Sequence, residues 1–131
     1  MTDDRLLQLA EEARQNSYSP YSCTSVGAAL LTKSGKVYTG ANVECASYPA
    51  GICAERSALA AAVSAGEREL AAIAVAGGAH GEPSTVPFYP CGMCRQALYE
   101  FSPEMRVITA DGTVTLKELL PLAFNGEAIK K

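Results

Sequence analysis

The chain has 131 residues, of which 48% are hydrophobic, and 11 basic against 14 acidic side chains give it a formal net charge of −3. This length and composition predict one folded domain over residues 1–131 and argue against a disordered chain. Because no run of Lys or Arg is present, the sequence lacks the electrostatic signature of a nucleic-acid-binding protein.

The signals that direct a protein to a membrane or out of the cell are also missing. Residues 1–4 are acidic where a signal peptide would be basic. The most apolar region, residues 58–79, is interrupted by the charged segment 67–69 and is therefore not a membrane span. An odd number of cysteines, five, argues against a disulfide framework in a chain without a secretion signal. We expect a cytoplasmic protein with no membrane partner.

The first half of the chain predicts a helix, a hairpin and a second helix. Thr2 can cap the first helix, whose apolar stripe should end by Asn16. An apolar run at 26–31 and a second strand from Val37 are joined by a short glycine-containing turn, which is typical of a hairpin. Alanine dominates residues 53–65 and predicts the second helix.

The second half alternates between strands and helices. We expect a strand at 70–76, a loop at 77–89, a helix from Cys91 to about Phe101, a strand at 105–109 and a short helix at 116–120. This alternation predicts an α/β fold, in which a mixed sheet of about five strands is covered by helices on both faces as a three-layer α/β/α sandwich.

Two polar residues follow the second strand of the hairpin. Asn42 and Glu44 are two positions apart, so in an extended segment they share one face. Their acceptors and amide donor suit a sugar diol. The same spacing also fits an ordinary polar face on an edge strand, and the residues alone do not choose between the two interpretations.

Two short blocks carry the chemistry that stands out most. Residues 51–56 contain Cys53 and Glu55, and residues 90–94 contain Cys91 and Cys94. Three thiols and one carboxylate match a catalytic zinc that keeps its fourth position for water. The Cys-x-x-Cys pair by itself also fits a structural zinc site or a redox pair. If both blocks begin helices, the helix N-termini would draw charge from the thiolates.

These blocks resemble the zinc-dependent nucleobase deaminase signature, and the chain as a whole resembles the small, homotetrameric cytidine deaminases. The resemblance rests on five motifs in the same order as in that family: residues 18–22 followed by 26–30, 42–44 followed by 46–48, 53–56, 90–96 and 119–124.

The resemblance implies a three-layer fold, one Zn²⁺ per subunit and a homotetramer with sites shared between subunits. Cys53, Cys91 and Cys94 would bind zinc. Glu55 would shuttle protons during attack on C4 of cytosine, and Arg56 would support the thiolates. The nucleoside would contact six further residues, two of them through the backbone: Asn42, Glu44, Tyr48, Ala54, Pro90 and Phe124. Cytidine and 2′-deoxycytidine would become uridine and 2′-deoxyuridine, as in pyrimidine salvage.

Two positions depart from the family pattern. Cys45 stands where the family usually has Asn, and Thr24 where it usually has a Phe that packs near the base. The site is therefore open to a modified cytosine nucleoside such as blasticidin S, or to another ring, such as Phe88, in place of that Phe. An alternative of another class is a structural zinc domain that binds partners, which would not depend on Glu55.

Overall fold

A computed structural model describes residues 1–130 of the chain, and its centre is a five-stranded sheet in the order β2-β1-β3-β4-β5. The strands are β1 (Thr24–Thr32), β2 (Val37–Ala41), β3 (Leu70–Ala79), β4 (Arg106–Thr109) and β5 (Gly112–Thr115). Only the β3–β4 pair is parallel within the described residues, so the sheet is mixed, as predicted.

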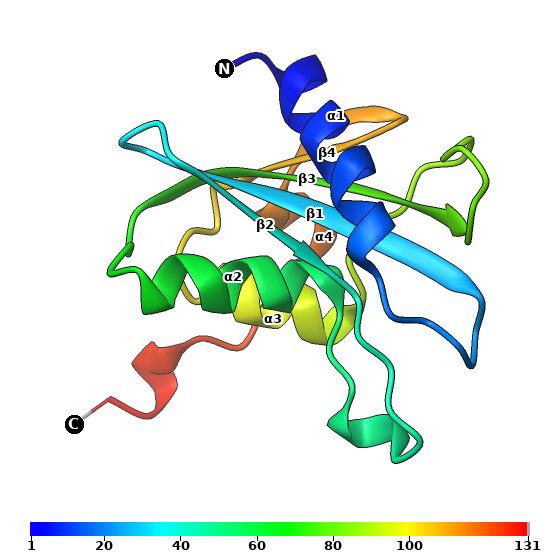
Figure 1. The fold of residues 1–131 in the computed structure, drawn as a ribbon. Coiled ribbons are helices and arrows are strands. Elements are labelled where there is room, and N and C mark those ends of the chain that lie inside the picture. Colours follow the sequence, from blue (N-terminus) through cyan, green and yellow to red (C-terminus); the bar gives the residue numbers. More distant parts are fainter. Residues whose placement is uncertain (131) are drawn as a thin grey trace.

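One helix covers one face of this sheet. Helix α1 (Asp3–Ala13) begins after Thr2, whose side chain accepts a hydrogen bond from the Arg5 amide at 3.1 Å. The helix packs across the sheet (Figure 1). Its buried residues Leu6 and Ala10 meet small side chains of β1 and β3, together with Ile108 of β4. Burial of each large aliphatic side chain stabilises the fold by about 1.5–3 kcal/mol.

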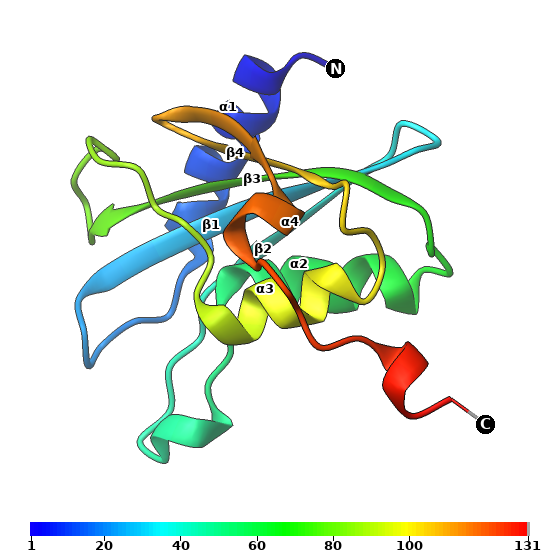
Figure 2. The same cartoon turned by 180° about the vertical axis from the view of Figure 1, so that it is seen from behind.

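The other face carries α2 (Ala54–Ser64), α3 (Gly92–Tyr99) and α4 (Leu116–Leu119), as Figure 2 shows from behind. Helices α2 and α3 lie side by side in both views. Helix α2 approaches β2 so closely that a Cβ at Gly40 would lie 2.5 Å from the Ala58 amide nitrogen. This close approach fixes the start of α2 against the sheet. The three-layer α/β/α prediction is therefore confirmed.

Several element boundaries differ from the sequence prediction by one to three residues. The loop expected from residue 77 begins later, because β3 continues through Ala79 and pairs with the start of β1, with Gly77 opposite Val26. Helix α3 ends at Tyr99, slightly before the expected Phe101. The longer β3 matters for the site because its last residues support the loop that leads to Cys91, through a hydrogen bond from the Gly77 amide to Ser84 Oγ.

Within residues 1–130, no helix combines the length and the apolar character that crossing a bilayer requires.

Candidate active site at the three-cysteine cluster

Two helix N-termini converge on the cysteine cluster. Cys53 is the N-cap residue of α2 and Cys91 is the N-cap residue of α3, both with extended backbone conformation. Neither side chain makes the usual capping hydrogen bond of a helix N-cap residue. Cys94 follows in the first turn of α3. The free N–H groups and partial positive charge of both helix ends therefore face the sulfurs.

The sulfur positions match a zinc site. The Sγ atoms of Cys53, Cys91 and Cys94 all lie within 4.8 Å of one another. The Cys53–Cys91 pair is separated by 3.9 Å and the Cys91–Cys94 pair by 3.5 Å. Tetrahedral zinc with Zn–S bonds of about 2.3 Å would separate its sulfurs by about 3.8 Å. All five cysteines of the chain are free thiols. The donor set therefore fits zinc in both type and spacing.

The charges around the cluster also favour a cation. Burial raises the pKa of the Cys94 thiol, and the nearby negative charges of Glu55 and Cys53 raise it further. Several anions in one partly buried site repel each other unless a cation balances them. Nη2 of Arg56 lies 3.9 Å from the Cys53 sulfur, and its Nε is buried without a hydrogen-bond partner among the described residues. Arg56 thus places a guanidinium group beside the Cys53 sulfur.

Glu55 lies in the first turn of α2, two residues after Cys53, and is only 4% exposed. Burial raises the pKa of its carboxyl group, although the neighbouring Arg56 opposes this shift. A carboxyl group with a raised pKa beside an open cavity can accept a proton and later donate it. Glu55 therefore has the position and the environment of a general acid and base.

A cavity of about 630 Å³ opens next to this cluster, which is within the usual size range for small-molecule sites. Cys53, Glu55 and Cys91 lie on its wall. The remaining wall includes Val26 of β1, Phe88 and Tyr89 before α3, and Met93, none of which the sequence had marked as site residues except Phe88 as a possible substitute ring. The sequence offered no local signal for Val26 or Met93, because only the fold brings them to this wall.

Asn42 and Glu44 both lie on the cavity wall, as does Val43 between them. They also hold the preceding loop in place. Asn42 Oδ1 accepts hydrogen bonds from the Val26 amide at 2.8 Å and from the Ser17 hydroxyl, and its Nδ2 donates to the Thr24 carbonyl at 3.0 Å. The interpretation as a plain polar edge therefore does not describe Asn42, which joins β1 to the segment after β2.

The carboxylate of Glu44 receives three hydrogen bonds from one turn of the loop before β1. The amides of Tyr21 and Ser22 donate to its Oε1 at 2.9 and 3.0 Å, and the Ser22 hydroxyl donates to its Oε2. The Ser22 hydroxyl and amide hold the pKa of Glu44 below its usual range. Glu44 is therefore an anion near neutral pH that retains unused acceptor capacity.

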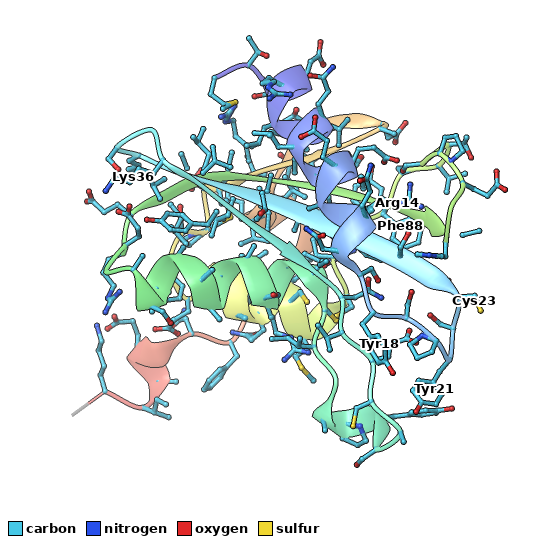
Figure 3. The ribbon with its side chains drawn as sticks, viewed as in Figure 1. Arg14, Tyr18, Tyr21, Cys23, Lys36 and Phe88 are labelled. Atoms are coloured by element: carbon cyan, nitrogen blue, oxygen red, sulfur yellow. The ribbon has the colours of Figure 1, made fainter. Side chains whose placement is uncertain are left out.

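The other predicted contact residues divide into two groups. Ala54 and Tyr48 lie on the cavity wall, where Tyr48 packs edge-to-face on Tyr21 with ring centres 5.9 Å apart. Figure 3 shows Tyr21 on the loop beside the turn that carries Tyr48. Pro90 and Phe124 are not on the wall formed by this chain. Pro90 is fully buried, and its carbonyl oxygen accepts a hydrogen bond from Arg95 Nε at 2.7 Å, whereas Phe124 is 59% exposed.

The two positions that depart from the family pattern, Cys45 and Thr24, differ in whether they line the cavity. Cys45 lies on the cavity wall, but Thr24 does not. The Thr24 amide donates to the Ser22 hydroxyl oxygen at 3.1 Å, and its side chain hydrogen bonds within the same loop.

Comparisons with known proteins agree with this geometry. Residues 1–110 match the family model described as "Cytidine and deoxycytidylate deaminase zinc-binding region". A cytidine deaminase of Halalkalibacterium halodurans is 43% identical over 97% of both chains. The solved cytidine deaminase of Burkholderia pseudomallei is 46% identical, with a TM-score of 0.85 over 95% of this chain and all of the other. A blasticidin-S deaminase of Bacillus cereus is more distant, at 31% identity over 76% of each chain.

Proposed function

Since the chain belongs to the cytidine and deoxycytidylate deaminase family, we infer that it hydrolyses cytidine and 2′-deoxycytidine to uridine and 2′-deoxyuridine with release of ammonia. The observation that carries this function is the position of Glu55, buried beside three zinc-spaced thiols on the wall of one cavity. A structural zinc domain would need neither the carboxylate nor the cavity.

Cys53, Cys91 and Cys94 would hold one zinc ion per subunit. When bound, zinc would lower the pKa of a water molecule and so supply a nucleophile near neutral pH. The two helix N-termini and Arg56 would offset the negative charge of the three thiolates. These groups would keep the water acidic enough to lose a proton.

Glu55 would move the protons of the reaction. Its carboxylate would accept one proton from the water and give it to N3 of cytosine as the oxygen attacks C4. It would then carry the second proton to the exocyclic amino group, so that the C4–N bond breaks and ammonia leaves. Both transfers need one carboxyl group close to both the water and the base, which its place after Cys53 allows.

Asn42 and Glu44 would hold the sugar with the hydrogen-bonding capacity that the loop leaves unused. Asn42 Oδ1 already accepts two hydrogen bonds, and one of its two Nδ2 protons is used, so one N–H donor remains. Glu44 accepts three hydrogen bonds of about four possible, so one acceptor position remains. One donor and one acceptor satisfy a single hydroxyl. Because the 3′-hydroxyl is common to both nucleosides, this pair would accept ribose and deoxyribose alike.

Assembly, cellular context and the remaining contacts belong to the same proposal. The chain would act as a homotetramer in the cytoplasm, as part of pyrimidine salvage. Exposed apolar side chains near the cavity and on the C-terminal segment support an interface: Tyr48, Met93, Leu122 and Phe124. Phe124 would then reach a neighbouring subunit's site, while the backbone of Ala54 and Pro90 would contact the base.

The test is cytidine deamination by the zinc-loaded protein, followed as loss of cytosine absorbance, with Glu55→Gln as control. We expect the variant to keep its zinc and to lose at least about 100-fold in kcat. Absence of turnover by zinc-loaded wild type would refute the cytidine assignment. Turnover of blasticidin S in place of cytidine would reassign the substrate. Absence of turnover with both compounds would favour a structural zinc domain.

A further inference from the structure

The Phe88 ring packs directly against the backbone of β3 at Gly77, where only glycine leaves room for it. A Cβ added at Gly77 would lie 2.5 Å from Cδ2, 2.6 Å from Cγ and 2.8 Å from Cε2 of Phe88. Contacts this short with three adjacent atoms of a rigid ring could not be relieved by a small side-chain rotation. The ring therefore rests directly on the backbone of β3, and any other residue at position 77 would displace it.

The loop that carries Phe88 is anchored at the same point. The Gly77 amide donates a hydrogen bond to Ser84 Oγ at 3.2 Å, so the chain folds back onto β3 before it reaches Phe88. Phe88 then precedes Cys91 by only three residues. These connections hold the ring at the sheet and close to the cysteine cluster.

The ring also forms part of the cavity wall. Val26, the cross-strand partner of Gly77, lines the same cavity and packs against the same core cluster as Phe88. The other aromatic residues on the wall are Tyr21, Tyr48 and Tyr89, which are 50%, 74% and 36% exposed and therefore lie at its mouth. Phe88 is the one half-buried aromatic ring on the wall among the described residues, and Figure 3 labels it at the sheet.

On the basis of the proposed function, we propose that Phe88 forms the aromatic surface that contacts the pyrimidine and that Gly77 determines specificity by setting the ring's position. Thr24, where an aromatic would be expected, does not reach the cavity. Removing a stacking aromatic weakens base binding by roughly 5- to 150-fold. Phe88 would contribute this affinity. The closeness of its ring to the Gly77 backbone would set the width of the space that remains for the base.

The test is a set of variants assayed for cytidine kinetics and for binding of uridine by calorimetry. Phe88→Leu keeps an apolar side chain but removes the ring. We expect it to raise KM for cytidine by roughly 5- to 150-fold and to weaken uridine binding by the same factor, with kcat changed less than about threefold. An unchanged KM together with a lowered melting temperature would show that Phe88 only packs against β3, and would overturn the proposal.

Gly77→Ala tests the seat, and Gly78→Ala is its matched control. The Gly77 variant should raise KM because the new methyl group pushes the ring into the cavity. At Gly78 the atoms nearest an added Cβ belong to Arg14, at 3.1 Å, and to the Pro83 carbonyl, at 3.6 Å, and not to Phe88, so KM should stay within about twofold of wild type. In the double variant Gly77→Ala/Phe88→Leu, the methyl group added at position 77 no longer meets an aromatic ring. Its KM should equal that of Phe88→Leu alone, whereas simple multiplication of the two effects would refute the coupling.

This inference and the proposed function fail in different ways. If zinc-loaded wild type does not deaminate cytidine, the proposed function falls, and the inference falls with it. If wild type turns cytidine over and Phe88→Leu retains both KM and uridine affinity, only the assignment of the ring and its glycine seat is lost.

Discussion

Replacing Asn42 by alanine should weaken both the fold and substrate binding. The change removes hydrogen bonds to the Val26 amide, the Thr24 carbonyl and the Ser17 hydroxyl. Each such bond contributes about 1 kcal/mol net, and water from the cavity can replace part of the loss. We therefore expect the free energy of unfolding to fall by about 2–3 kcal/mol. Loss of the remaining N–H donor should separately raise KM for cytidine by roughly 2- to 12-fold.

The assay is urea unfolding of the zinc-loaded protein at one fixed protein concentration, together with steady-state kinetics. Asn16→Ala is the matched control, because Asn16 is exposed and makes no side-chain hydrogen bond within residues 1–130, so its stability should stay within about 0.5 kcal/mol of wild type. If Asn42→Ala unfolds at the same urea concentration as wild type, the hydrogen-bond argument is wrong. If it is destabilised but keeps its KM, Asn42 only supports the loop and does not bind the sugar.

Three further outcomes follow from the geometry. Cys94→Ser should bind less than one zinc per chain by metal analysis and should lose activity, whereas Cys23→Ser, with an exposed thiol away from the cluster, should retain the wild-type zinc content. Glu44 has a lowered pKa in the fold, so its stabilising effect is present above its ordinary pKa of 4.5 and is lost as pH falls through the lower folded value. The melting-temperature difference between wild type and Glu44→Gln should therefore be constant near pH 7 and shrink below about pH 4.5, and a difference that grows in acid would contradict this sign. Thr115→Ala should lower stability by about 1 kcal/mol in urea unfolding, because it removes one side of the capping box with Glu118 at the start of α4; no measurable change would show that solvent replaces the cap.

The sequence was most informative where the signals are local. Alanine-rich residues predict α2, and the Cys-x-x-Cys spacing places Cys91 and Cys94 within one helical turn, whereas only the fold brings Cys53 to them. The boundary at Gly77 was predicted wrongly because adjacent glycines locally indicate a loop, whereas pairing with β1 keeps them in the strand. Tertiary pairing of this kind is invisible in the local pattern.

The hydrogen bonds of Asn42 and Glu44 were beyond prediction for the same reason. Their partners lie in the loop before β1 and at the start of β1, about 20 residues earlier in the chain, and Val26 of β1 also lies on the cavity wall. The seat of Phe88 on Gly77 likewise depends on two residues that no local rule relates. Sequence reasoning therefore predicted the cysteine cluster and Glu55, and the fold supplied the cavity wall beside them.

The positions of the ligands along the chain have a consequence for metal acquisition in the cell. Cys53 and Cys91 are 38 residues apart, and all of β3 lies between them. In an unfolded chain local spacing brings together only Cys91 and Cys94, and Cys53 joins them when the fold forms. Zinc bound by these three thiols would therefore have its highest affinity for the folded chain. Zinc retention would then report on correct folding.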